Sequence, residues 1–286
     1  MELTNLADIK KLLLKNGIVL TKARGQNFII NPSVCPRMAG ECGAGKSDGV
    51  LEIGPGIGVL TAELARVAGK VVSIELDSGL VPILSETLSN FDNVKIIEGD
   101  ALKLNLKEII EREFSERRVF VCANIPYNIS SKLVMRLLES DLNIEAVTVM
   151  VQKEFADRIC ARVGSRQSGA ITVGAAFYAS CTELFGVSAG SFFPPPKVDS
   201  TVMKLVPYKQ PPVEVKDRDF FMKTVNAGFC QRRKTLQNSL GSGLSVSKAA
   251  VENALREMGK NPLARIEELD LFELAELSNK LFEEKK

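Results

Sequence analysis

Short apolar runs rich in β-branched residues alternate, along the first half of this chain, with segments of helical periodicity. The runs predict strands over 50–54, 71–76, 94–100, 119–124 and 146–152. Runs such as VVSIEL and AVTVMVQ are apolar almost throughout, which is typical of strands buried on both faces. Strands that alternate with helices form parallel sheets joined by crossover helices. The alternation therefore predicts a doubly wound α/β sheet.

The remaining pattern divides the chain into two predicted domains. Helices are expected between the strands and after them, over 60–68, 79–90, 106–114, 131–139, 153–161 and 168–179. Two further strands are expected over 182–187 and 198–206, separated by the proline-rich FFPPPK. A second proline cluster then marks a boundary, and all later segments have helical periodicity, over 218–229, 233–240, 247–258 and 270–282. We predict a domain over 1–207, with an N-terminal extension over 1–24, and a small all-helical domain over 208–286.

Charge is distributed unevenly, although the 286 residues carry a formal net charge of only +2. Residues 197–265 hold 13 Lys and Arg against 6 Asp and Glu, whereas residues 266–286 hold 3 against 7. Clustered positive charge attracts phosphate backbones through counterion release. The pattern fits either a nucleic-acid interface or a solvated basic surface.

Histidine is absent from the whole sequence. This excludes nucleophilic catalysis of the Ser-His-Asp and Cys-His kinds. The six cysteines show no paired CxxC spacing, so we expect no metal site. The N-terminus lacks the apolar core of a signal peptide, and no apolar run is long enough to cross a membrane. We therefore expect a cytoplasmic protein.

One motif matches a phosphate-binding loop in its letters but not in its predicted structural context. Residues Gly40–Ser47 (GECGAGKS) match the phosphate-binding pattern GxxxxGKS letter for letter. That pattern binds phosphate only where a strand precedes it and a helix follows it. Here the predicted strand comes after the motif, so we interpret it as a loop with flexible glycines.

A second glycine-rich segment follows the first predicted strand directly. Gly54, Gly56 and Gly58 lie in EIGPGIGVLT, where glycine lets the backbone turn tightly and approach a ligand. Open α/β sheets bind ligands at this end of the strand. The spacing is G-x-G-x-G rather than the G-x-G-x-x-G of dinucleotide sites, which argues against a NAD-dependent oxidoreductase.

Two carboxylates follow at the ends of the next predicted strands. Glu75 lies about twenty residues after the loop, where a carboxylate can accept both ribose hydroxyl groups. Asp100 ends the third strand, within reach of an adenine amino group. Each alone is more typical of a helix cap or a surface carboxylate, but three features at consecutive strand ends favour an adenosyl ligand.

The fourth predicted strand ends in the tetrapeptide NIPY, Asn124 to Tyr127. The exocyclic amine of a base is a poor nucleophile because its lone pair is delocalised into the ring. Hydrogen-bond acceptors on both N–H groups free that lone pair, and we assign these roles to the Asn124 side-chain oxygen and the Pro126 carbonyl. Tyr127 offers an aromatic face on which a base can stack. The motif predicts methylation of an amino group.

These motifs together resemble the ribosomal RNA adenine dimethyltransferases. NIPY is joined by GQNF at 25–28, VQKEFADRI at 151–159, FFPPPKVDS at 192–200 and FCQRRKTLQNSL at 229–240. The last run is similar to the bacterial KsgA/RsmA branch, and the similarity extends from about residue 14 to the C-terminus. The resemblance implies a Rossmann-like class I methyltransferase fold and S-adenosyl-L-methionine as the cofactor.

The resemblance also implies roles for individual residues. It places the cofactor against Asn27, Ile29, Gly54, Gly56, Glu75, Asp100 and Asn124. Phe192 would stack on the adenine opposite Tyr127. Phosphate contacts are expected from Lys197, Arg232, Arg233 and Lys234, although the basic cluster is also compatible with a solvated helix end.

The implied substrate is a pair of adjacent adenosines in the 3′-terminal hairpin of 16S rRNA, each dimethylated at N6 in the small ribosomal subunit by a monomeric enzyme. Two alternatives remain open. One is a 23S rRNA adenine methyltransferase of the antibiotic-resistance type, or a DNA adenine methylase of the same fold. The other is an assembly factor that binds RNA without transferring methyl groups.

Overall fold

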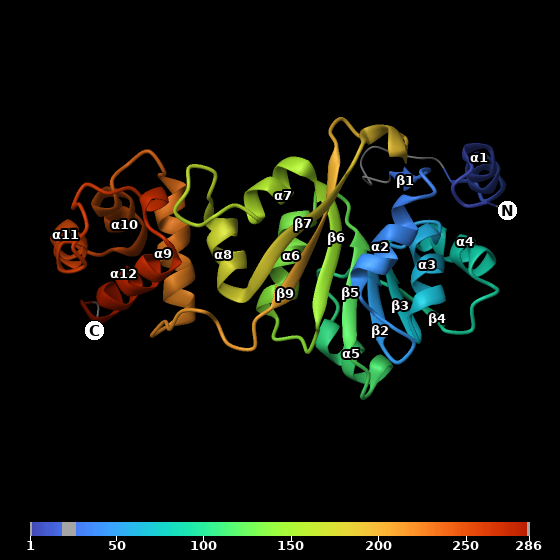
Figure 1. Cartoon of the computed structure of the whole chain (residues 1–286), viewed down its shortest axis with the longest axis horizontal. Coiled ribbons are helices and arrows are strands. Elements are labelled where there is room, and N and C mark those ends of the chain that lie inside the picture. Colours follow the sequence, from blue (N-terminus) through green and yellow to red (C-terminus); the bar gives the residue numbers. More distant parts are fainter. Residues whose placement is uncertain (1, 19–26, 285–286) are drawn as a thin grey trace. The chain divides into compact units, whose positions relative to one another are not determined.

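The computed structural model describes residues 2–18 and 27–284 (Figure 1). The chain forms two compact units. The first comprises residues up to Ala156 together with Cys181–Pro207, and the second comprises Asp157–Ser180 and the residues from Tyr208 onward.

The first unit is built on a seven-stranded sheet in the order β4-β3-β2-β5-β6-β9-β7. Strands β2 to β6 pair in parallel, and β9 runs antiparallel to β6. Their bounds are β2 Gly49–Ile53, β3 Lys70–Glu75, β4 Val94–Glu98, β5 Val119–Asn124, β6 Ala146–Gln152, β7 Ala179–Val187 and β9 Ser200–Pro207. The predicted doubly wound sheet is confirmed, with most strand ends within two residues of expectation.

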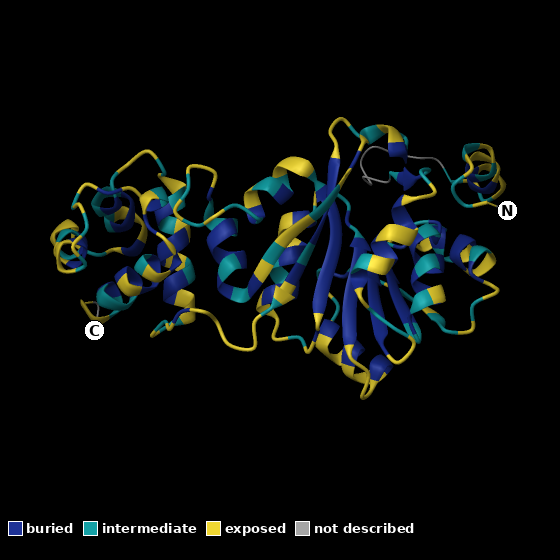
Figure 2. Cartoon of the chain, in the orientation of Figure 1, coloured by how far each residue is buried: buried dark blue, intermediate teal, exposed yellow. Residues whose placement is uncertain are grey.

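Crossover helices connect these strands, as the periodicity predicts. They are α3 Val59–Val67, η2 Ser78–Leu80 with α4 Val81–Thr87, α5 Leu106–Phe114, α6 Ser130–Glu139 and α7 Lys153–Ile159, with the short η3 Ala189–Ser191 before β8. Alternate strand residues face opposite sides of the sheet. On one side Val50, Val71 and Phe120 pack in a cluster with α2 and α3, while their neighbours Leu51, Val72 and Val121 on the other side are fully buried too. Strands β2, β3, β5 and β6 are therefore dark blue along most of their length in Figure 2.

Besides η3, four elements of the first unit have no counterpart in the sequence prediction. They are α1 Leu6–Lys15, β1 Phe28–Ile29, α2 Val34–Cys42 and β8 Phe192–Phe193. Helix α2 contains Pro36, which is tolerated there because it lies in the first turn, where the backbone N–H has no partner within the helix. Strands β1 and β8 form a separate antiparallel ribbon in which Phe28 is opposite Phe193 and Ile29 is opposite Phe192.

The second unit is helical and includes a segment that we expected in the first domain. Its helices are α8 Ala170–Tyr178, α9 Arg218–Cys230, α10 Leu236–Leu244, α11 Lys248–Glu257, η4 Ile266–Glu268 and α12 Leu271–Glu284. Val173 and Phe177 of α8 belong to the same apolar cluster as Phe221 of α9, and the rings of Phe177 and Phe221 are 5.2 Å apart. A single boundary at 207/208 therefore does not describe the packing, because burial of α8 draws residues 157–180 into the helical unit. Across the described residues, no helix has the length and apolar character needed to span a bilayer.

Candidate active site at the carboxyl ends of the parallel strands

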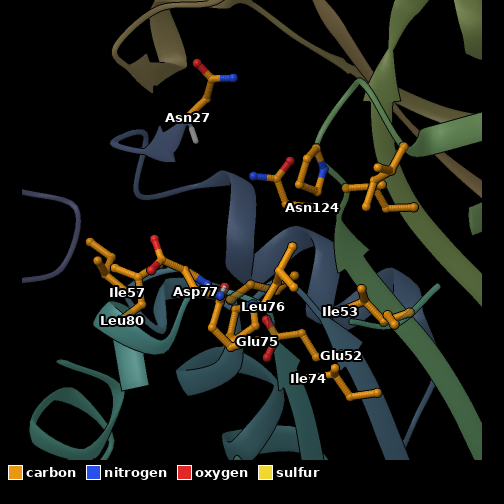
Figure 3. A pocket seen from close by; sticks show the side chains of 18 of the residues that line it. Asn27, Glu52, Ile53, Ile57, Ile74, Glu75, Leu76, Asp77, Leu80 and Asn124 are labelled. Carbon is orange, nitrogen blue, oxygen red and sulfur yellow. Dashed lines mark hydrogen bonds between the residues drawn. The ribbon is translucent and has the colours of Figure 1, made fainter. Parts of the chain in front are cut away.

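A cleft of about 490 Å³ lies where β2, β3, β4 and β5 end (Figure 3). Parallel strands bring their carboxyl ends to one edge of a sheet, so residues far apart in the sequence meet there. Nine of the ten residues predicted for cofactor binding or catalysis line this cleft: Asn27, Ile29, Gly54, Gly56, Glu75, Asp100, Asn124, Pro126 and Tyr127.

The glycine-rich loop between β2 and α3 forms one wall of the cleft. Gly54, Gly56 and Gly58 all have positive φ, at 72°, 62° and 91°. At Gly56 a Cβ atom would lie 3.5 Å from the ring of Phe28, which also lines the cleft. Positive φ costs little only for glycine, so this turn requires glycine at all three positions.

Glu75, the last residue of β3, is held by the backbone on both sides. One carboxyl oxygen accepts a hydrogen bond from the Gly56 N–H at 3.2 Å, and the other accepts one from the Asp77 N–H at 2.8 Å. Burial raises the pKa of Glu75 above its usual range, although these two hydrogen bonds oppose the effect. The carboxylate thus lies against the glycine-rich loop, on the floor of the cleft.

Asp100 lies two residues beyond the end of β4, in a turn that is fixed by Arg136. One Asp100 oxygen accepts from the Leu102 N–H at 2.9 Å. The Arg136 guanidinium of α6 donates to the carbonyl groups of Leu102 and of Leu104, the latter at 2.6 Å. The bracing role of Arg136 carried no signal in the sequence, because α6 and this turn are separated by about thirty residues.

The end of β5 places an amide at the cleft. In Figure 3 the side chain of Asn124 extends over the cleft between Asn27 and the floor. Pro126 lines the same cleft, but its carbonyl already accepts hydrogen bonds from the Ile129 N–H at 3.1 Å and the Ser130 hydroxyl at 3.2 Å. These two bonds use both lone pairs of that oxygen. The expected role of the Pro126 carbonyl is therefore wrong for this geometry.

The preceding carbonyl, that of Ile125, is a better acceptor. Ile125 lines the cleft, and its N–H donates to the Met150 carbonyl at 3.2 Å. Among the described residues, no hydrogen bond to the Ile125 carbonyl is present. The sequence did not distinguish Ile125 from Pro126, because the choice depends on where α6 begins.

Tyr127 is half-buried at the cleft and its hydroxyl is 2.7 Å from the Ser200 hydroxyl of β9. Burial raises the pKa of Tyr127, so the phenol is neutral at physiological pH. The contact with Ser200 holds the hydroxyl end of the ring, and Tyr127 is, with Phe28, one of the aromatic residues that line the cleft.

Phe192 does not lie where the resemblance implied. Its side chain is only 2% exposed and packs with Ile29 and neighbouring apolar residues in the core. In a strand, adjacent side chains point to opposite faces, so Phe193 shares a face with Phe28 instead. Phe193 is half-buried, and the Lys10 ammonium lies 5.2 Å from the centre of its ring.

Glu52 is a cleft residue that the sequence analysis did not assign. It is 1% exposed, and one of its carboxyl oxygens accepts a hydrogen bond from the Ser73 hydroxyl at 2.6 Å. The other oxygen, Oε1, is buried without a hydrogen bond within normal distance and angle. Burial raises the pKa of Glu52 to about 7. The available signal was a single acid in the otherwise apolar run VLEIG.

The predicted RNA-binding residues fall into two groups. Lys197 is exposed before β9, and Arg233 and Lys234 are exposed in the turn between α9 and α10. Arg232 forms an ion pair with Glu267 and donates to the Arg166 carbonyl. Its guanidinium is engaged within the helical unit, so we no longer count Arg232 among the phosphate-binding candidates.

The segment that matches GxxxxGKS lies at the opposite edge of the sheet, where the parallel strands begin. Gly43 ends α2 with φ of 86°, and the loop leads into the start of β2. Asp48 accepts a hydrogen bond from the Gly45 N–H at 2.8 Å and pairs with Arg118 at 3.0 Å. The interpretation as a loop is confirmed from Gly43 onward, although Gly40–Cys42 close α2. Within the described ranges, no three His, Cys, Asp or Glu side chains are grouped so as to hold a metal ion.

A parallel sheet with an antiparallel strand β9 beside β6, and a glycine-walled cleft at its carboxyl edge, defines a class I methyltransferase. Among solved structures, the chain is similar to a dimethyladenosine transferase from Plasmodium falciparum, with a TM-score of 0.69 and 28% identity over 87% of this chain and 95% of that one. It is also similar to the 23S rRNA methyltransferase ErmE, with a TM-score of 0.68 and 28% identity over 90% of this chain and 100% of that one.

The family follows from sequence comparison. Residues 20–280 match the model of the ribosomal RNA adenine dimethylase family. The ribosomal RNA small subunit methyltransferase A of Shouchella clausii is 43% identical over 95% of this chain and 93% of its own length. The protein of the same name from Geobacillus thermodenitrificans is 42% identical over 95% and 94%. The chain belongs to the ribosomal RNA adenine dimethylase family, as its motifs predicted.

Proposed function

We propose that this enzyme transfers methyl groups from S-adenosyl-L-methionine to N6 of two adjacent adenosines in the 3′-terminal hairpin of 16S rRNA, and that it acts as a monomer on the small ribosomal subunit in the cytoplasm. The convergence of Gly54, Glu75, Asp100 and Asn124 on one cleft carries the proposal. The relatives of 40–43% identity, all named small subunit methyltransferase A, support the choice of subunit.

The residues of the cleft fit this cofactor. The cleft contains two carboxylates whose pKa values are raised by burial, Glu52 and Glu75, and a wall of glycines whose lack of side chains leaves room for a ligand. Glu75 would accept the ribose hydroxyl groups and Asp100 the adenine amino group, with Asn27, Ile29 and Gly56 completing the cradle. When bound, the cofactor supplies an electrophilic methyl group on sulfur.

At the reaction centre, the chain's own groups orient the target amine. The Asn124 side-chain oxygen and the Ile125 carbonyl would each accept one N–H of the adenine amino group, which turns its lone pair toward the methyl group. The alkylated amine loses its proton readily to water, so the absence of histidine is compatible with this chemistry. Positioning of this kind can supply roughly 7–11 kcal/mol of rate enhancement.

Base and RNA binding would use separate surfaces. The target base must leave its stack, which costs a few kcal/mol and less in a loop. Stacking on Tyr127 returns about 1–3 kcal/mol. Lys197 of the first unit, and Arg233 and Lys234 of the helical unit, would contact phosphate groups; we propose that the helical unit serves mainly in RNA binding.

A methylation assay tests the proposal. The protein is incubated with tritiated S-adenosylmethionine and either undermethylated small subunits or naked 23S rRNA, and the products are analysed by mass spectrometry. We expect N6,N6-dimethyladenosine at two adjacent positions near the 3′ end of 16S rRNA.

Other products would redirect the assignment. The similarity to ErmE makes 23S rRNA the competing substrate, and label in 23S rRNA alone would favour that function. Subunit binding without methyl transfer would instead indicate an assembly factor.

A further inference from the structure

Arg136 of α6 is a half-buried cation whose partners are backbone carbonyl groups. Its two terminal nitrogens donate to the Leu102 carbonyl and, at 2.6 Å, to the Leu104 carbonyl. Its Nε is buried without a hydrogen bond within normal distance and angle. Within the described ranges, neither partner is a carboxylate. Taking a cation out of water without an anion costs free energy, so this arrangement calls for a physical explanation.

The two carbonyl groups belong to the turn that carries Asp100. The Asp100 carbonyl accepts hydrogen bonds from the Lys103 N–H at 2.8 Å and the Leu104 N–H at 2.9 Å. The Asp100 carboxylate accepts one from the Leu102 N–H at 2.9 Å. These bonds fix the carboxylate relative to its own turn. Arg136 then fixes the turn relative to α6, because two donors in one rigid plane set orientation as well as position.

A second cation, Lys103, contributes less to the position of Asp100. Its ammonium lies 3.6 Å from the other Asp100 oxygen, and its side chain is 83% exposed. Exposed ion pairs contribute little, because water screens the charges and ordering a long side chain costs entropy. The place of the Asp100 carboxylate therefore depends on its turn, and the place of the turn depends on Arg136.

The helix that carries Arg136 also begins next to the predicted reaction centre. Ser130 is the first residue of α6, and its hydroxyl donates to the Pro126 carbonyl at 3.2 Å. One helix is thus bonded at its start to the segment that follows Asn124, and further along to the turn of Asp100. Since Asp100 and Asn124 line the same cleft, α6 connects the adenine end of the proposed cofactor site with the methyl-acceptor end.

We propose that Arg136 is a positioning residue for cofactor recognition, which holds the Asp100 carboxylate where it accepts the amino group of the adenine ring. Arg136 is not among the residues that line the cleft, so it acts through Asp100. The arrangement selects a purine ligand with a free 6-amino group. This inference rests on the proposed function, because it requires the adenine of S-adenosylmethionine to lie against Asp100.

Two ligands that differ only in the amino group of the base test this role. S-adenosylhomocysteine carries that group, and its analogue in which unsubstituted purine replaces adenine does not. Titration calorimetry of the full-length protein gives the dissociation constant of each. We expect the wild type to bind S-adenosylhomocysteine roughly 10-fold more tightly, because the purine analogue lacks a hydrogen bond to a charged group. In Arg136→Met, the dissociation constant of S-adenosylhomocysteine should rise to that of the purine analogue, whose own value should stay close to that of the wild type.

The ratio of the two dissociation constants separates positioning from general stability. A merely structural role of Arg136 would weaken the binding of both ligands alike, and an unchanged ratio would overturn the proposal. Arg136→Lys keeps the positive charge but not the planar pair of donors, so it should restore only part of the preference for adenine. If Arg136→Met does not fold, Arg136→Lys decides the question, and a preference equal to that of the wild type would then overturn the proposal.

A double variant tests whether Arg136 acts through Asp100. Residues that act on one contact have effects that do not add. In protein that carries Asp100→Ala, a further Arg136→Met should therefore leave the dissociation constant of S-adenosylhomocysteine unchanged. Additive losses would contradict the proposal.

The matched control is Arg117→Met, because Arg117 also donates to a backbone carbonyl group, that of Ser47 at 3.0 Å, where β2 and β5 begin. It should bind both ligands as the wild type does. Normal binding of S-adenosylhomocysteine with an unchanged ratio in Arg136→Met would refute the role of Arg136 and leave the proposed function intact. Equal binding of the two ligands by the wild type would overturn the adenine contact of Asp100 and this proposal with it. Failure of the wild type to bind S-adenosylhomocysteine at all would refute the proposed function itself.

Discussion

The pKa values of two carboxyl groups shift in opposite directions at the two ends of the parallel strands. At the edge where the parallel strands begin, Glu113 is 6% exposed and pairs with Lys70, Lys95 and Arg112. Hydrogen bonds led by that from Lys95 hold the pKa of Glu113 at about 2. At the edge where the strands end, Glu52 is 1% exposed, no described cation contributes to its electrostatics, and burial raises its pKa to about 7.

The difference separates stability from function. A buried charge that is fully paired belongs to the folded structure itself, whereas a buried carboxyl group without a partner costs stability and is typical of a site that awaits a ligand. We therefore expect substitutions at the first edge to change the free energy of unfolding, and substitutions at the second edge to change binding or catalysis.

The largest effect is expected for Asn124→Ala. Removal of the amide oxygen leaves one N–H of the target amine without an acceptor, and losing one such oriented group in an active site typically costs about 100-fold to 1,000-fold in kcat. Single-turnover methylation of undermethylated small subunits measures the loss. The melting temperature should change little, because Asn124 is only half-buried.

Asn143→Ala is the matched control, at an exposed asparagine between α6 and β6. It should methylate at the wild-type rate. A wild-type rate for Asn124→Ala would remove Asn124 from the reaction centre. A large fall in the melting temperature together with the loss of rate would instead place Asn124 among the structural residues.

A smaller effect is expected for Glu75→Ala. Hydrogen bonds to a charged acceptor are worth about 1.5–3 kcal/mol, so the dissociation constant for S-adenosylmethionine should rise roughly 10-fold to 100-fold. Calorimetric titration measures it, with the exposed Glu98→Ala as the comparison. An unchanged dissociation constant would contradict the ribose contact that we assign to Glu75.

Sequence alone predicted the features that short-range patterns determine. The strands follow from apolar runs, and the glycine-rich loop, Glu75 and Asn124 follow from their positions directly after strands. Since parallel strands end at one edge, this spacing was enough to bring these residues together. The fold class and most of the cleft were accessible for this reason.

What the sequence missed depends on contacts between distant segments. Phe192 and Phe193 are indistinguishable as letters, and only the register of β8 against β1 sends Phe192 into the core. Helix α1 is short, and its buried face packs against Ile57 and Leu80, which lie forty residues or more away. The choice between the Ile125 and Pro126 carbonyl groups likewise depends on the first turn of α6.

At the stabilising edge, Glu113→Gln should lower the free energy of unfolding by about 2 kcal/mol at pH 7, because three cations lose their shared anion. The pKa of Glu113 is lower in the folded state than its usual value of 4.5. Its contribution is therefore present above pH 4.5 and is lost as the pH falls toward about 2. Denaturant titrations of wild type and variant should converge over that range.

The affinity of Glu113→Gln for S-adenosylmethionine at pH 7 should equal that of the wild type wherever the variant is folded. A variant that keeps its stability but binds the cofactor poorly would break the comparison between the two edges.

The smallest effect is expected for Lys46→Ala, in the loop that matches GxxxxGKS. In a true phosphate loop this lysine contacts the phosphate groups, so its loss would abolish nucleotide binding. Here Lys46 is exposed, and its loop leads into the start of β2. Since ligands bind these sheets at the other end of the strands, we expect the dissociation constant for S-adenosylmethionine to stay within about twofold of the wild type, and calorimetry should detect no ATP binding by either protein. If the wild type bound ATP and Lys46→Ala did not, both ends of β2 would bind ligands. Pairing of a buried carboxylate would then no longer distinguish the structural edge of the sheet from the functional one.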